Sequence, residues 1–445
     1  MAACDGTISR MGGQEGATPV PAIVEFPTVV QDALRKYGDI FLNAPERRHF
    51  AEYLTGLIVA ERKTVAGINS EFAVTTDQSC LNRWINEAGW DPRALNDSRL
   101  AHLQLDPSTR YSAHGAIAID NTLIDREGKL IPDAGYFWDH GDKRYLVAQD
   151  YVIANYVCTS GKHYALEFRR FRKREHCEAA REELSERKGG IAAASEEERA
   201  LAEFKTHDGL VMELVDYVVE HGIPGDFTWD CYFTNAEVMN HVNGLGRGYA
   251  GDLKPNRKIR FEGREIHASD LATLIPPEDR RPVWIGEAKK WYFTKTIRIP
   301  KVDHPVRIVV TWDRKNGTKA GKILVTNRTY WEVTRILGVY LKRWTGTETL
   351  HRDGKQHLGM GDCQVRNREG QTRHMYMVFL AHSELVGWMR QGRAREWAHA
   401  MLTTVGEACR AALRETLAKT LEWALERVTK EGWDVPRVKT ALSLA

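Results

Sequence analysis

The chain has 445 residues, of which 42% are hydrophobic and 28% are charged, and its formal net charge is +3. This composition is typical of an ordinary globular protein, and the length suggests two or three domains. No apolar run approaches the roughly 18–20 residues that a membrane-spanning helix needs, so we expect no membrane partner. The small net charge does not decide whether the chain binds nucleic acid. Local basic clusters such as residues 169–176 are more informative, because phosphate binding depends on the local field.

The seven cysteines are scattered and form no Cys-x-x-Cys pair, so the sequence predicts neither a disulfide framework nor a structural zinc site. His163, His176 and Cys177 also lack the spaced partners of a zinc site. Residues 1–27 are rich in Gly, Ala and Pro and show no basic segment followed by an apolar one. We therefore expect a disordered leader rather than a signal peptide, and a reducing, cytoplasmic environment.

Residues 28–110 show the apolar spacing of helices, so we expect a helical domain, for which DNA binding is one of two interpretations. Capping residues precede an amphipathic helix that ends at Gly89. Asn82, Arg83 and Asn86 share the polar side of that helix, as a helix that reads a DNA groove requires. The polar face of a small helical bundle explains the same pattern equally well, so both interpretations stay open.

The pattern changes to strands after residue 110. Three consecutive strand candidates predict an antiparallel meander, and the first of them, AIAID, ends at Asp120. Residues 175–208 are charged and rich in Ala, which favours a helix with an exposed hinge at 188–190. A further helix and a Gly-Pro turn then lead to a short strand, DFTWD, that ends at Asp230.

Residues 257–320 contain a series of strand-like segments, and the pair Asn316–Gly317 is a strong signal for a hairpin. This β-rich segment separates Asp230 from a helix that carries Glu348. The last part, residues 386–445, is mostly helical and contains a leucine stripe that is more typical of packing within the chain than of a dimer seam. The stripe consists of Leu413, Leu417, Leu421 and Leu425.

Two strands that end in aspartate, followed by a helix with a solitary glutamate, form a pattern that can bind metal. Asp120, Asp230 and Glu348 would supply three hard oxygen ligands, which suit Mg²⁺ or Mn²⁺. Two such ions about 3.5–4 Å apart can activate an attacking oxygen and stabilise the leaving one. Glycosidases also use paired carboxylates. Here, however, the neighbours are Arg, Lys and His rather than aromatic sugar platforms, so the pattern favours phosphoryl transfer.

These motifs resemble those of the DDE transposases of bacterial insertion sequences, in the IS4-like group and its IS701-like branch. The resemblance runs from about residue 30 to 390 and rests on AIAIDNTLIDREGK, FTWDCYFTNAEV, DLKPNRK, KILVTNRT and the stretch YLKRWTGTETLHRDGK. It implies an α/β fold whose RNase H-like catalytic core, here residues 111–256 and 321–385, is interrupted by a β-rich insertion at 257–320. Helical N-terminal and C-terminal regions would flank this core. The resemblance assigns Asp120, Asp230 and Glu348 as the catalytic metal ligands.

The family signature is Tyr, two residues, Arg, three residues, Glu, six residues, Lys, which corresponds here to Tyr340, Arg343, Glu348 and Lys355. The chain departs from it, because four residues rather than three separate Arg343 from Glu348. On a regular helix this five-residue step would place the two side chains about 140° apart. A single-residue π-bulge at residues 345–347 would absorb the extra residue.

Two other acids compete with Glu348 for the third metal ligand, namely Glu332, upstream in the chain, and Asp353, but we rank both below it. The resemblance implies that Tyr340, Arg343 and Lys355 hold phosphates, since Arg suits bidentate grip and Lys acts as a point charge. Lys254 and Asn256 are further candidates for contact with DNA. The candidates for stacking on a flipped base are Trp284, Trp291 and Trp312. A tryptophan in a β-rich segment is, however, more often a core residue.

The activity that the resemblance implies is cut-and-paste transposition. Water attacks the phosphodiester at a transposon end, and the released 3′-hydroxyl attacks a second phosphodiester, in this group commonly on the opposite strand to give a hairpin end. The expected cofactor is Mg²⁺ or Mn²⁺. The expected partners are the double-stranded DNA of the terminal inverted repeats and of the target, with a homodimer in the synaptic complex, in a bacterial cytoplasm and associated with the nucleoid.

A catalytically silent, domesticated DNA-binding protein of transposase origin is the main alternative, and a plain metal-dependent nuclease of similar fold is a third. Three acids that converge in a cleft repel one another unless a metal is present. A silent binder has no physical need to keep them. The presence of all three therefore favours the active enzyme.

Overall fold

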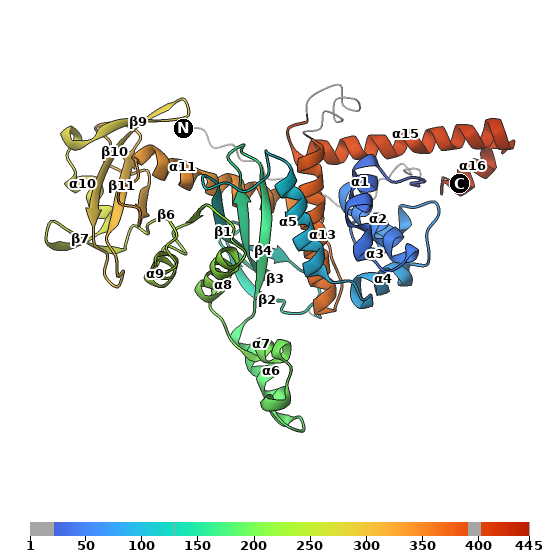
Figure 1. The fold of residues 1–445 in the computed structure, drawn as a ribbon, viewed down its shortest axis with the longest axis horizontal. Coiled ribbons are helices and arrows are strands. Elements are labelled where there is room, and N and C mark those ends of the chain that lie inside the picture. The colour runs from blue at the N-terminus through green and yellow to red at the C-terminus, as the bar shows by residue number, and fades with distance from the viewer. Residues whose placement is uncertain (1–21, 129, 390–401, 445) are drawn as a thin grey trace.

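The computed structural model describes residues 22–128, 130–389 and 402–444 (Figure 1). Most of the predicted leader, residues 1–21, lies outside the described residues. Its last residues are packed rather than disordered, because Ile23 is buried and forms a β-bridge with Phe72. Figure 1 shows three parts in a row: a body of helices, a central sheet and a smaller strand-rich end.

The helical body combines both ends of the chain. Asn43, Thr64, Asp77 and Asp91 cap its N-terminal helices by accepting hydrogen bonds from backbone amides, as the sequence predicts for the helix that Asp77 begins. These helices share one hydrophobic core with two C-terminal helices, of which α13 is buried along most of its length. The helices of this body are α1 (Thr28–Tyr37), α2 (Ala44–Val59), α3 (Val65–Ser70), α4 (Gln78–Glu87), α5 (Pro92–Leu105), α13 (Arg368–Trp388), α15 (Val405–Glu431) and α16 (Val435–Ala441).

The central sheet begins with the predicted meander, which the structure confirms. Strand β3 pairs antiparallel with β1 along one edge and with β2 and β4 along the other, while β5 lies parallel to β1 and β6 parallel to β5. The short strands β2 and β6 were not expected from the sequence. The six strands are β1 (Ala116–Asp125), β2 (Gly135–Asp139), β3 (Arg144–Val157), β4 (His163–Phe171), β5 (Asp226–Trp229) and β6 (Tyr249–Asp252).

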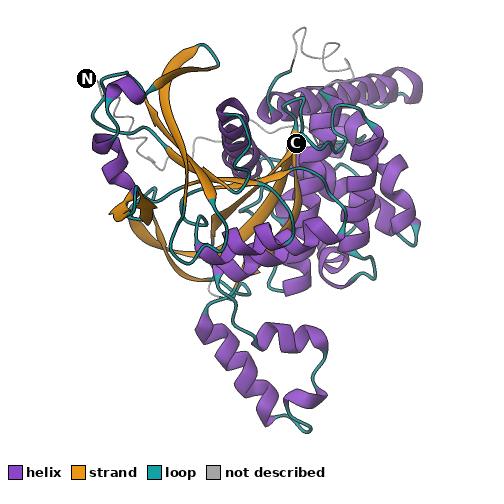
Figure 2. Cartoon of the chain, turned by 60° about the vertical axis from the view of Figure 1, so that its left-hand side comes forward, coloured by secondary structure: helices purple, strands orange, loops and turns teal. Residues whose placement is uncertain are grey.

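Helices cover both faces of this sheet. Helices α8 (His207–Glu220) and α9 (Ala236–Gly244) share a core with Ile117, Ile119, Phe227 and Trp229. Helix α11 (Val333–Trp344) packs on the opposite face, where it buries Ala116 and Ala250. Between β4 and α8, helices α6 (Arg174–Glu186) and α7 (Glu196–Ala202) project from the molecule as an arm (Figure 1, Figure 2). Their junction lies at the predicted hinge.

Strands β9, β10 and β11 of the predicted β-rich segment continue the central sheet through β12, which follows the segment, whereas β7 and β8 form a separate two-stranded sheet. Strand β12 pairs with β6 on one side and with β11 on the other. The pairing of β11 with β12 confirms the predicted hairpin, but the connection is a longer loop than a two-residue Asn-Gly turn. The elements are β7 (Lys258–Phe261), β8 (Arg264–His267), α10 (Leu271–Leu274), β9 (Arg281–Ile285), β10 (Ala288–Ile297), β11 (Val306–Trp312) and β12 (Ile323–Thr326).

The leucine stripe lies on α15, and its C-terminal half is exposed, with Leu421 62% and Leu425 55% accessible to solvent. Packing within the chain therefore covers only part of the stripe. Within the described ranges, no helix is both long enough and apolar enough to cross a membrane.

Candidate active site

Asp120 and Asp230 lie at the same level of two neighbouring parallel strands. The register pairs Ala116 with Asp226 and Ala118 with Thr228, so two residues further along the chain Asp120 comes opposite Asp230. Residues two apart in a strand point to the same face, and neighbouring strands are about 4.8 Å apart. Both carboxylates therefore lie on the face of the sheet that α11 covers.

A π-helix brings Glu348 to these two aspartates. Helix α11 ends at Trp344, residues Thr345–Thr349 form a π-helical turn, and α12 (Leu350–His357) follows without a break. The predicted bulge is confirmed. The Arg343 guanidinium consequently bridges both acids, since its Nη1 atom lies 2.9 Å from Asp120 Oδ2 and 3.9 Å from Glu348 Oε1. The extra residue in the signature does not separate Arg343 from Glu348.

Because one extra residue in a helix is accommodated as a π-bulge, we expect deletion of Thr345 to restore a regular α-helix and to leave Arg343 and Glu348 together. Thr345 is the half-buried first residue of the turn. If the cleft cuts DNA as the resemblance implies, cleavage by the deletion variant should stay within about tenfold of wild type, a barrier change of about 1.4 kcal/mol. Deletion of Arg352 in α12 is the control, since it turns Lys355 by about 100° around the helix axis. An equal loss of cleavage in both deletion variants would contradict the interpretation that the π-turn only accommodates the extra residue.

The three acids line one open cleft of about 850 Å³, together with Arg343 and Lys355. The rival acids lie elsewhere. Glu332 is the exposed N-cap of α11, and Asp353 is buried on another side of α12, next to His163 and His382. Among the acids weighed for the third position, Glu348 alone lines the cleft with both aspartates.

The cleft concentrates negative charge at Asp120. Burial, followed by the nearby carboxylate of Asp230, raises the pKa of Asp120 from its usual 3.8 to about 7, although the Arg343 guanidinium acts in the opposite direction. Glu348 adds a smaller effect of the same sign as Asp230. A divalent cation would relieve this repulsion, and carboxylate oxygens are the ligands that Mg²⁺ and Mn²⁺ prefer. The donor set therefore fits the expected cofactor.

The raised pKa of Asp120 predicts a pH-dependent response to metal. Between about pH 4 and pH 7 the folded protein retains a proton that the unfolded chain has released, so this group's contribution to stability falls as pH rises. Metal competes with that proton. Mg²⁺ should therefore raise Tm more at about pH 8 than at about pH 5.5, and the difference should disappear in Asp120→Asn. Thermal unfolding with and without Mg²⁺ measures it, and equal shifts at both pH values would contradict the assignment.

The other predicted DNA-contact residues lie outside the cleft. The Tyr340 hydroxyl is 3.3 Å from Asp252 Oδ2, and the side chain is mostly buried. Lys254 and Asn256 line a neighbouring groove that meets the cleft at Tyr232, over whose ring the Lys254 ammonium lies. Arg83 is exposed on α4, which lies in the helical body beyond α13 (Figure 1).

The structure reduces the number of tryptophan and arginine side chains that can contact nucleic acid. Trp312 is completely buried under the Arg280 guanidinium and cannot stack on a base, Trp291 is half-buried, and Trp284 is 64% exposed. In the basic cluster at 169–176, Arg170 and Arg172 form ion pairs with the buried Asp133. These two arginines therefore serve the interior rather than a DNA surface.

Sequence reasoning missed several residues that line the cleft. Asp150 on β3 accepts hydrogen bonds from Asn121 and lies 2.7 Å from His207 Nε2, so a fourth, buried carboxylate stands beside the three acids. The sign of Asp150 in the sequence was its position as a charged residue in the middle of an apolar strand. Trp138 and Tyr232 are partly exposed aromatic residues of the same cleft. Trp138 was hidden because the short strand β2 was not expected.

The family model described as DDE superfamily endonuclease matches residues 37–288, more than half of the chain. The chain belongs to the DDE superfamily endonuclease family. The matched range of this DDE endonuclease contains Asp120 and Asp230 but ends before Glu348, so the third acid rests on the signature around it and on the geometry of the cleft. No curated protein matches the chain.

Proposed function

We propose that this DDE endonuclease is the transposase of a bacterial insertion sequence, of the IS4-like group and its IS701-like branch. In this proposal it cuts phosphodiester bonds at transposon ends and joins the 3′-hydroxyl ends to target DNA. The observation that carries the proposal is the presence of Asp120, Asp230 and Glu348 in one cleft with Arg343 and Lys355. Three acids beside two phosphate-binding cations suit phosphodiester chemistry.

Each side chain would have a distinct role in the reaction. Asp120, Asp230 and Glu348 would hold the divalent ions, which when bound supply activation of the attacking oxygen and stabilisation of the leaving one. Arg343 would orient Asp120 and Glu348 through its two contacts and offer its remaining donors to a DNA phosphate. Lys355, on the same side of the helix as Glu348, would attract the neighbouring phosphate. Tyr340 would act indirectly, through Asp252.

The order of the strands supports an RNase H-like core. Three antiparallel strands, β1, β3 and β4, are followed by two parallel strands, β5 and β6, on the other side of β1. This arrangement is the ground on which we propose the RNase H-like core that the resemblance implies. Residues 257–320 would then be the insertion that precedes the glutamate-bearing helix. We also propose that residues 28–110 contact DNA, with Arg83 as the exposed candidate of α4, and that two copies assemble on the paired ends.

The polar side of α4 offers fewer free groups than the sequence suggested. The Asn86 amide donates to the backbone and side-chain oxygens of Asn82, so this pair is partly satisfied within the helix. Lys254 and Asn256, in the groove that meets the cleft at Tyr232, are proposed to hold the DNA backbone beyond the cut. A path for DNA from the cleft along this groove is consistent with the basic residues that line it, Arg257, Lys258 and Lys301.

The experiment that tests the proposal uses a plasmid that carries the coding sequence with its native flanking DNA. The purified protein is incubated with it in Mg²⁺, in Mn²⁺ or in a chelator. A transposase gives metal-dependent breaks at fixed positions on both sides, and joined products after longer incubation. A silent DNA-binding protein would retard the flanking DNA without cutting it. Cuts without joining would favour a plain nuclease, and resistance of the ends to exonuclease would identify hairpins.

A further inference from the structure

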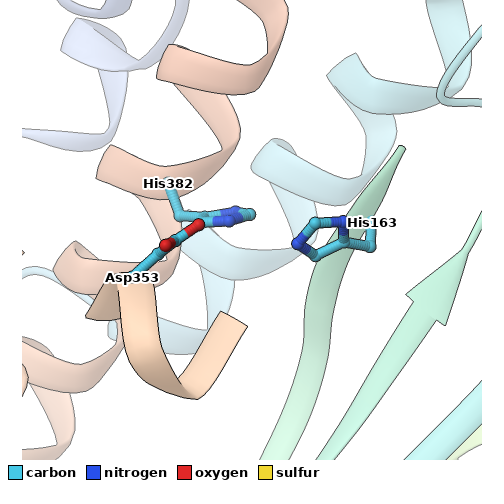
Figure 3. A group of neighbouring side chains, drawn as sticks. All are labelled: His163, Asp353 and His382. Carbon is cyan, nitrogen blue, oxygen red and sulfur yellow. The ribbon is translucent and has the colours of Figure 1, made fainter. Parts of the chain in front are cut away.

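A second group of metal-ligand side chains lies outside the cleft. His163 at the start of β4, Asp353 on α12 and His382 on α13 place their ligand atoms within 4.8 Å of one another. Figure 3 shows the three side chains converging from these three elements. They come from distant parts of the chain, which is why the spacing of His163 in the sequence gave no sign of a zinc site.

Three ring nitrogens of this group are buried and lack the hydrogen-bond partners that buried polar atoms normally have. His382 is 2% exposed, and neither of its ring nitrogens has a hydrogen-bond partner in the described structure. Nε2 of His163 is also buried without a partner. Asp353 is 5% exposed, and its only ion pair within the described residues is a loose one of 3.5 Å with the exposed Arg352. Leaving such groups unsatisfied is destabilising, so something is expected to bind them.

The histidines are in the form that binds metal. Burial lowers the pKa of His163 to about 4, and burial together with His163 lowers that of His382 well below its usual value, so both rings are neutral at physiological pH. The backbone carbonyl of Gly161 acts on the His163 ring and works against this lowering of its pKa. A backbone acceptor of this kind fixes the tautomer of a metal-binding histidine and leaves Nε2 free as the ligand.

We propose that His163, Asp353 and His382 bind one zinc ion, with a water molecule or the second Asp353 oxygen in the fourth position. Two imidazoles and one carboxylate are a zinc ligand set, whereas Mg²⁺ prefers oxygen ligands alone. Zinc bonds of about 2.0–2.2 Å in a tetrahedron bring ligand atoms about 3.3 Å apart, so the ligand atoms, which lie within 4.8 Å of one another, need to close by at most about 1.5 Å. The deep burial of Asp353 and His382 favours a structural site.

The zinc ion would connect three elements that meet beside the catalytic cleft. Helix α12 follows directly from the π-helix of Glu348, and it packs against both α13 and β4. The bound ion would fix α12 to the sheet and to the helical body at Asp353, which follows Glu348 by five residues. This site does not depend on the proposed function, since a silent DNA-binding protein would need it equally.

The test measures zinc in the full-length protein, with excess Mg²⁺ present to occupy the carboxylate cleft. After chelation and return of one equivalent of zinc, we expect one ion per chain, a higher Tm, and a tetrahedral absorption spectrum when Co²⁺ replaces zinc. Asp353→Asn and His382→Gln should weaken zinc binding by more than the roughly 10–100-fold that loss of an outer partner causes. His221→Gln, an exposed histidine, should bind zinc as wild type does.

Wild-type protein that takes up no zinc would overturn the proposal, and so would full retention of zinc by the Asp353 and His382 variants. If these variants do not fold, X-ray absorption of the zinc-loaded wild type decides. A spectrum that shows two imidazole ligands together with oxygen would support the site. A spectrum that shows sulfur ligands, or only oxygen ligands, would overturn it. If the wild-type protein binds zinc at this site but does not cut DNA, that result would count against the proposed function and leave the zinc site standing.

Discussion

Asp120→Asn, Asp230→Asn and Glu348→Gln should each reduce DNA cleavage by about 10³-fold or more, which corresponds to about 4 kcal/mol of lost transition-state stabilisation. Each change keeps the size of the side chain and removes the negative charge that a divalent ion requires. The measurement is the rate of cleavage of a DNA that carries the native flanking sequences, in saturating Mg²⁺.

The control for these variants is Glu332→Gln, which removes an acid from the same helical segment but outside the cleft. It should cut at the wild-type rate. All three cleft variants should still bind DNA, because Arg343 and Lys355 remain. Full activity of Glu348→Gln, with loss in Glu332→Gln, would show that the third acid had been misassigned.

Gly346→Ala should destabilise the protein by about 1–3 kcal/mol, the range for forcing an extra methyl group into a packed core. A Cβ atom at this glycine would lie 2.7 Å from Val157 Cγ2 and 2.8 Å from Ala118 Cβ, two side chains on the rigid strands β3 and β1. The π-helix must retreat from the sheet to make room. Glu348 would retreat with it, so cleavage should fall more than stability explains.

Gly338→Ala is the matched control for this change. Gly338 lies in the middle of α11, it is exposed, and nothing lies within 4 Å of a Cβ atom built on it. Because alanine is the better helix former by about 1 kcal/mol, this variant should be slightly more stable than wild type and fully active. Chemical denaturation and cleavage assays on both variants separate the two effects. A Gly346→Ala protein as stable and active as wild type would contradict the close packing of the π-helix.

Much of the catalytic strand arrangement was predictable, because its signals are local. The apolar runs before Asp120 and Asp230 fix two strands, and the parallel register then places both acids on one face. The extra residue before Glu348 suggested the π-bulge, because a bulge of one residue is a local change that keeps Arg343 and Glu348 on one side. The strands of residues 257–320 were equally evident, although their continuity with the central sheet was not.

What the sequence did not predict depends on contacts between distant residues. Asp150 and Trp138 reach the cleft through the pairing of β3 with β1 and β2, which no local pattern encodes. Ion pairs with Asp133 turn Arg170 and Arg172, two residues of the basic cluster at 169–176, toward the interior. Nothing in the sequence around Asp133 predicts that it would bind these arginines. The grouping of His163 with His382 requires β4 and α13 to meet, although 218 residues separate the two histidines (382 − 163 − 1).

In the proposed mechanism, Asp120, Asp230 and Glu348 together hold divalent ions in the cleft. The most direct measurement is anomalous diffraction at the manganese edge from crystals soaked in Mn²⁺. We expect one or two manganese peaks, each within about 2.0–2.4 Å of carboxylate oxygens of the three acids. Peaks that lack Asp230 or Glu348 as a ligand, or a cleft without manganese at saturating concentration, would contradict the account.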